Sequence, residues 1–183
     1  MFNRPRETFV FECEQWFPLP LERVFAFFAD AVNLQEITPP WLHFKVLTPS
    51  PIAMKVGTLI DYKLRIHALP VRWRTLISQW QPPHRFVDEQ IRGPYKLWRH
   101  LHTFEPVDGG TLVKDHVDYQ SVGGSLVNRF FIRPDLEKIF GYRQMVLTQK
   151  LGNATGGGDA MTHNMTHNMT HNMTHNSPAS VPS

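Results

Sequence analysis

The sequence predicts an α+β domain in which a curved antiparallel sheet wraps around one long C-terminal helix. Two observations support this prediction. Between residues 8 and 119 the chain alternates apolar and polar residues in short segments separated by turn signals, which is typical of antiparallel strands. A longer segment near the end of this region carries an apolar stripe at helical spacing. One sheet wrapped around one helix is the economical way for these elements to share a core.

The first elements are defined by alternation and by prolines. A strand is predicted over 8–16, where apolar and polar residues alternate until Pro18 interrupts them. A short helix is predicted over 21–29, because Pro20 stands just before its start and apolar residues recur at helical spacing. A second helical turn is predicted over 33–37, since two prolines follow it closely.

Six further strands and the long helix complete the domain. The strands are expected over 43–47, 58–67, 71–80, 85–91, 95–104 and 111–119. The turn before the third of these six is expected at 68–70, and Gly-containing turns separate the last three strands. The helix is predicted over 126–147, and Pro134 either kinks it or begins its main segment. A twisted sheet that closes on a single helix cannot fill its own concavity, so we expect an apolar cavity suited to a small molecule.

Composition divides the chain into a folded domain over 1–150, in which we expect the ligand cavity, and a tail over 151–183. The tail begins with a Gly-rich linker and continues with tandem Met-Thr-His-Asn repeats. The repeat has no apolar face large enough to offset the entropy of ordering it, so we expect disorder there.

Several classes of protein are disfavoured by composition. The formal charge is only +3 and the basic residues are scattered, so no nucleic-acid partner is expected. The apolar runs are too short for stable membrane insertion, and the basic N-terminus is not followed by the apolar run of a signal peptide. Cys13 is the single cysteine, which excludes a disulfide framework. We therefore predict a cytoplasmic protein and leave its oligomeric state open.

The most informative stretch is the strand predicted over 95–104. Residues two apart in a strand share a face, so Trp98, His100, His102 and Phe104 form one stripe. Two imidazoles between aromatic walls are typical of a core or of a pocket.

The neighbouring strands carry polar residues that can share that face. We predict a polar cluster of Asp88, Gln90, His100, His102 and Asp115, because buried carboxylates and imidazoles need partners and each supplies the other's. The blander interpretations are a hydrogen-bond network that fixes strand register and a polar face turned to solvent. A shift of one residue in register would turn the whole set outward.

The chain resembles a known family in the runs Pro70-Val-Arg-Trp-Arg-Thr-Leu-Ile77, Trp80-Gln-Pro-Pro-His-Arg-Phe-Val-Asp88, Gly93-Pro-Tyr95, Trp98-x-His100-x-His102-x-Phe104 and Gly110-Thr-Leu-Val-Lys-Asp115. Together with the order of elements, these runs resemble the polyketide cyclase/dehydrase-type branch of the START-like, birch-pollen-allergen-like superfamily (SRPBCC). The resemblance covers roughly residues 7–148. It implies a helix-grip fold with an internal cavity, and it places Trp41 near the cavity mouth, where this side chain either gates entry or simply packs.

From these arguments we predict that the protein binds a small, mostly apolar ligand such as a lipid, a polyketide or an aromatic compound. The expected ligand-binding residues are Trp41, Tyr62, Trp73, Asp88, Gln90, Trp98, His100, His102, Tyr119 and Phe140. No cofactor is expected.

Three alternatives stay open. The first is a cyclase or dehydratase, for which the catalytic candidates are His100, His102, Asp88 and Asp115, because an imidazole beside a carboxylate is a competent general base near neutral pH. The second is a protein-interaction module with a vestigial cavity. The third is a metal site, since His-x-His on a strand can supply two ligands and a carboxylate a third, but the resemblance implies a protein that works without metal.

Overall fold

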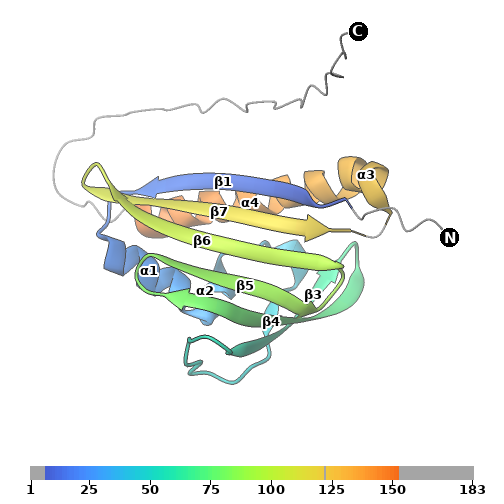
Figure 1. Ribbon diagram of the computed structural model, residues 1–183, viewed down its shortest axis with the longest axis horizontal. Helices are drawn as coiled ribbons and strands as arrows, with labels where there is room; N and C mark the ends of the chain where they lie inside the picture. The colour runs from blue at the N-terminus through green and yellow to red at the C-terminus, as the bar shows by residue number, and fades with distance from the viewer. Residues whose placement is uncertain (1–6, 122, 153–183) are drawn as a thin grey trace, which may run out of the picture.

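The computed structural model describes residues 7–121 and 123–152 and contains one seven-stranded antiparallel sheet (Figure 1). The strands are β1 (Phe9–Phe17), β2 (Lys45–Val46), β3 (Leu59–Ile66), β4 (Leu69–Gln81), β5 (Arg85–Arg92), β6 (Leu97–Val107) and β7 (Gly110–Gln120). Their order across the sheet is β1-β7-β6-β5-β4-β3-β2, so β3 to β7 form a meander that β1 extends. The predicted tail and residues 1–6 lie outside the described residues.

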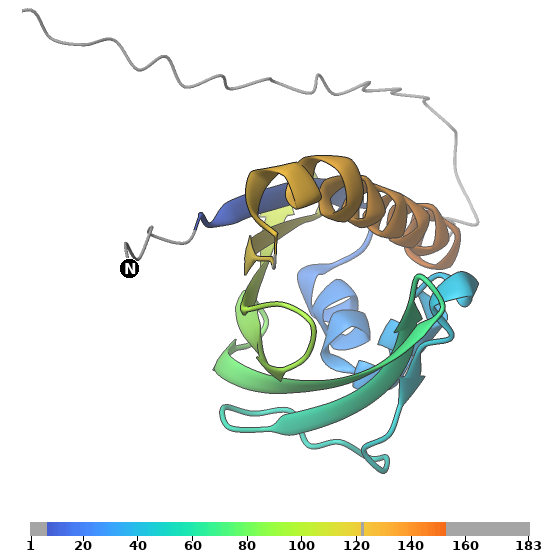
Figure 2. The same cartoon turned by 90° about the vertical axis from the view of Figure 1, so that its right-hand side faces the viewer.

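The helices lie on the concave side of this sheet. They are α1 (Leu21–Ala29), α2 (Ala31–Glu36), the short 3₁₀ turn η1 (Pro40–Leu42), α3 (Gly124–Val127), the π-helical turn η2 (Asn128–Ile132), α4 (Arg133–Leu147) and the π-helical turn η3 (Thr148–Gly152). Figure 2 shows the sheet curving around the inside of the molecule, with α4 closing the open side, and Figure 1 shows α1 and α2 toward one end. The predicted fold class is confirmed. No helix among the described residues is long and apolar enough to cross a membrane.

The C-terminal helix is longer than predicted. It runs without interruption from α3 through η2 into α4 and η3. Pro134 is the second residue of α4, directly after the π-helical turn η2, so it stands at the start of the main segment. Leu151 packs into the core with Phe17 and Leu147, which places it inside the folded domain and one residue beyond the predicted boundary at 150.

The turn between β3 and β4 is shorter than expected. It consists of His67 and Ala68 alone, with φ angles of 47° and 66°. Leu69 and Pro70, which we expected in the turn, are the first residues of β4. Proline is tolerated there because β5 begins to pair with β4 only at Arg74, so no ladder hydrogen bond to β5 is lost at Pro70.

Candidate functional site

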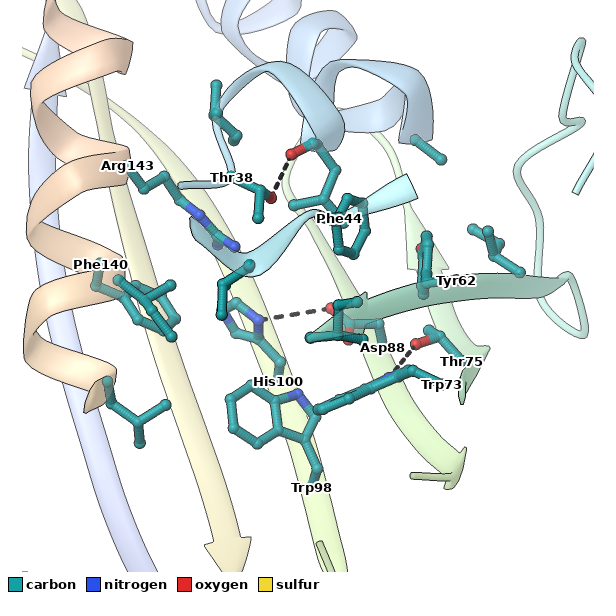
Figure 3. A pocket seen from close by; sticks show the side chains of 18 of the residues that line it. Thr38, Phe44, Tyr62, Trp73, Thr75, Asp88, Trp98, His100, Phe140 and Arg143 are labelled. Atoms are coloured by element: carbon teal, nitrogen blue, oxygen red, sulfur yellow. Dashed lines mark hydrogen bonds and ion pairs between the residues drawn. The ribbon is translucent and has the colours of Figure 1, made fainter. Parts of the chain in front are cut away.

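A cavity of about 450 Å³ lies between the concave face of the sheet and α4 (Figure 3). This volume falls within the range of sites for small molecules, about 300–1,000 Å³. Its wall is mostly apolar and aromatic. Most of the residues predicted to bind ligand line it: Trp41, Tyr62, Trp73, Asp88, Trp98, His100, His102 and Phe140.

Strand pairing brings the predicted polar residues together. β6 carries His100 and His102, and it lies between β5 and β7. Asp88 on β5 stands opposite His100, and Asp115 on β7 stands opposite His102. All four side chains point to the concave side, as their two-residue spacing predicted.

The two imidazoles lie between the two carboxylates. Their ring centroids are 3.7 Å apart. Oδ1 of Asp115 lies 2.9 Å from Nε2 of His100 and 2.8 Å from Nδ1 of His102, although the second contact is poorly aligned for a hydrogen bond. Oδ2 of Asp88 lies 3.0 Å from Nε2 of His102 and 3.6 Å from Nδ1 of His100. Phe86 stacks on His102 with a centroid distance of 4.2 Å, which fixes the ring.

These contacts divide the protons unequally. Burial, together with the neighbouring His102, lowers the pKa of His100. Burial also acts to lower the pKa of His102, but its close contact with Asp115 and its hydrogen bond to Asp88 outweigh burial and raise that pKa above its usual value. Burial acts to raise the pKa of Asp115, yet the hydrogen bond from His100 and the close contact with His102 hold it well below its usual value. Of the two imidazoles, His102 is therefore the one that favours the proton, and His100 is the one that favours the neutral form.

The same residues could hold a metal ion. Asp88, His100 and His102 each offer a ligand atom, and these atoms lie within 4.8 Å of one another. Two imidazoles and a carboxylate are suitable ligands for several transition metals. In this structure His102 pairs with Asp88, and His100 pairs with Asp115.

Two predicted residues do not line the cavity. Gln90 exchanges two hydrogen bonds with the backbone of Tyr95 and so braces the turn between β5 and β6. It does so because the pairing of these strands ends at Glu89, which frees Gln90 to fold over the turn. The hydroxyl of Tyr119 donates to Oδ1 of Asn128 at 2.8 Å, in the core beneath the start of the C-terminal helix.

Trp41 lies at the rim of the cavity. Its side chain is 43% exposed, and it packs edge-on against Tyr142 of α4 at 5.3 Å between ring centroids. Nζ of Lys138 lies 4.7 Å from the centre of the Trp41 ring system. The side chain therefore bridges η1 and α4 at the edge of the cavity.

Arg143 was missed as a site residue by the sequence analysis. It extends from α4 into the cavity, and its guanidinium carbon lies 4.7 Å from the ring centroid of Phe140. Figure 3 shows its side chain pointing toward the space in front of His100. The signal was present, because Arg143 follows Phe140 by three residues and so shares its helical face.

A family model described as polyketide cyclase / dehydrase and lipid transport matches residues 17–145. This match covers most of the chain and all of the strands and helices that enclose the cavity except β1 and the helix end. The chain belongs to the polyketide cyclase/dehydrase and lipid transport family. No curated protein matches the sequence.

Solved structures confirm the fold of this family member, at identities too low to say more. A protein from Thermus thermophilus, TTHA0849, is 17% identical with a TM-score of 0.64, and the match covers 80% of this chain and 99% of that one. Ara h 8.0201 is 16% identical with a TM-score of 0.60, covering 80% and 100%. Major latex-like protein 151 from Panax ginseng is 11% identical with a TM-score of 0.60, covering 79% and 97%. The chain thus shares its fold with these three proteins.

Proposed function

We propose that this protein binds a small, mostly apolar molecule, such as a lipid, a polyketide or an aromatic compound, in the cavity between the sheet and α4. The observation that carries the proposal is the hollow of about 450 Å³ that side chains leave unfilled. A hydrophobic core normally closes such voids, because each one forfeits packing energy. Its retention beside an aromatic wall supports a ligand and argues against a vestigial cavity.

The site is suited to selecting its ligand as well as holding it. Trp73 and Trp98 meet edge-to-face at 5.3 Å between ring centroids and offer two nearly perpendicular apolar surfaces. The hydroxyl of Tyr62 and the cluster around His100 add polar groups to the same wall. We propose that these groups orient the ligand, and that the protein acts in the cytoplasm.

A blocking variant tests ligand binding. Leu64 lines the cavity, whereas its neighbour Lys63 points to the opposite face of β3. Leu64→Trp should weaken the binding of a neutral fluorescent probe, phenylnaphthylamine, and Lys63→Trp should leave it unchanged. Equal affinities in both variants and the wild type would contradict the proposal. Native mass spectrometry of protein purified from its own host would identify the retained molecule.

One observation favours a second function, a cyclase or dehydratase that uses the same cavity. Nε2 of His100 is engaged by Asp115 at 2.9 Å, so Nδ1 of the neutral ring retains its lone pair. That atom lies 3.6 Å from Asp88, beside the cavity. A neutral imidazole in this position suits removal of a proton next to a carbonyl, which cyclisation and dehydration of a polyketide both require.

This second function can be tested before a substrate is known. The methyl protons of acetylnaphthalene exchange slowly in D₂O, and a general base in the cavity should accelerate the exchange measured by NMR. Replacement of His100 by Gln should abolish the acceleration, and His116→Gln on the convex side should not. An exchange rate that is the same with His100→Gln as with the wild type would exclude His100 as the base.

A further inference from the structure

Arg143 is a cation in the cavity wall without an anionic partner of its own. Its Nε is buried and donates to no acceptor among the described residues. None of the ion pairs formed within residues 7–121 and 123–152 includes it. The face of Phe140 supports the guanidinium at 4.7 Å but accepts no strong hydrogen bond. The buried Nε has lost water without gaining an acceptor, which is costly, so the position of Arg143 is best explained by a partner from outside the chain.

The nearby carboxylates do not supply that partner. Asp88 is engaged by Nε2 of His102 at 3.0 Å, and Asp115 by Nε2 of His100 at 2.9 Å. These carboxylates act on Arg143 only through space, because none of them lies within ion-pair distance of its guanidinium among the described residues. The N–H groups of the guanidinium are therefore free to donate two parallel hydrogen bonds to a planar anion.

We propose that the ligand is an apolar acid whose anionic group binds Arg143 while its apolar body lies against Trp73 and Trp98. This inference rests on the proposed function, since it names the chemical class of the molecule held in the same cavity. Figure 3 shows the geometry: Arg143 and the two tryptophans enter one space from α4 and from the sheet. A fatty acid and an aromatic carboxylic acid share the required chemistry, a carboxylate on an apolar body.

A matched pair of probes tests this inference. Anilinonaphthalene sulfonate and phenylnaphthylamine share an apolar body and differ in the anionic sulfonate. We expect Arg143→Gln to weaken binding of the sulfonate by about 10- to 100-fold, the effect of losing hydrogen bonds to a charged group, and to leave the neutral probe unchanged. Arg143→Lys should give an intermediate loss, because it keeps the charge and loses the fork. Arg133→Gln is the control, since Arg133 is on the same helix but pairs with Glu137 outside the cavity.

The outcomes separate this inference from the proposed function. If the wild type binds neither probe, both are overturned. If it binds both and Arg143→Gln weakens the two equally or not at all, only the inference is overturned.

If circular dichroism shows that Arg143→Gln does not fold, displacement of phenylnaphthylamine from the wild type decides. Dodecanoic acid must then act at lower concentration than dodecanol, or naphthoic acid at lower concentration than naphthalenemethanol. Equal potency within both pairs overturns the inference, and the pair that shows the difference identifies the aliphatic or the aromatic acid.

Discussion

At the scale of single residues, His102 is the cation that allows two carboxylates to be buried side by side. It lies within 3.0 Å of both Asp88 and Asp115, and its side chain is 8% exposed. Two buried carboxylates without a counter-charge would repel each other and lose their hydration. We therefore predict that the cluster requires a proton on His102.

Replacing His102 with Gln should test this requirement. The variant leaves Asp88 and Asp115 without their shared cation, so its free energy of unfolding should fall by about 3–5 kcal/mol. Urea unfolding measures the change. His116→Gln removes a half-exposed imidazole from between Glu12 and Asp118 and should cost at most about 1 kcal/mol. Similar losses in the two variants would show that the cluster is not held by charge.

The cluster should also make stability depend on pH. The pKa of Asp115 is lower in the folded state than in the unfolded chain, where it is about 3.9. Its contribution is therefore complete above the unfolded value and is lost as the pH falls through the folded value. The pKa of His102 is raised, so its contribution is complete below the unfolded value of about 6.5 and is lost as the pH rises through the folded value.

Asp115→Asn should reveal the acid side of this dependence. The free energy of unfolding of the wild type, measured in urea at a series of pH values, should fall as the pH drops below about 4. In the variant, that part of the fall should be smaller. An unchanged acid slope would mean that Asp115 does not titrate differently in the folded and unfolded states.

At the scale of elements, the alternation along the strands predicted that the polar residues share one face, but not which of them lie outside the cluster. Asp88, His100, His102 and Asp115 could be assigned to one face because neighbouring strands of a meander pair in sequence order. The position of Gln90 could not, because it depends on where the ladder between β5 and β6 ends. The sequence also could not predict which imidazole favours the proton, because this depends on small differences between contact distances in the cluster.

Two hairpin turns of the same length allow a matched test of backbone strain. His67 and Ala68 join β3 to β4, and Asp108 and Gly109 join β6 to β7, all with positive φ. Alanine is strained in this left-handed region, where φ of Ala68 is 66°, whereas glycine is not. Asp-Gly is a favoured sequence for such turns, and His-Ala is not.

Ala68→Gly should therefore raise the free energy of unfolding by about 1 kcal/mol, and Gly109→Ala should lower it by a similar amount. A Cβ at Gly109 would meet no atom within 4 Å, so that loss would come from the backbone alone. Denaturant unfolding of both variants measures the pair. Effects of the same sign in the two variants would contradict the assignment of strain to the turns.

At the scale of the whole molecule, the cavity exists because apolar clusters surround it without filling it. One cluster, around Phe17, Val24 and Phe104, closes the end beneath α1. A second, around Trp98 and Phe140, joins the sheet to α4. The sequence predicted a hollow between the sheet and a single helix. Which residues of α4 line the hollow depends on the rotation of the helix about its axis, and the apolar stripe of α4 defined that rotation only approximately.

The end of the C-terminal helix contributes to closing this structure, and a last variant tests how far the domain extends. Leu151 is 8% exposed and packs against the cluster beneath α1, although it lies past the predicted end of the domain. Leu151→Ala should lower the free energy of unfolding by about 2–5 kcal/mol, as expected for a buried leucine. Leu126→Ala is the control, because Leu126 is 69% exposed at the other end of the same continuous helix and its truncation should change stability little. A loss at Leu151 as small as that at Leu126 would place the end of the folded domain before Leu151.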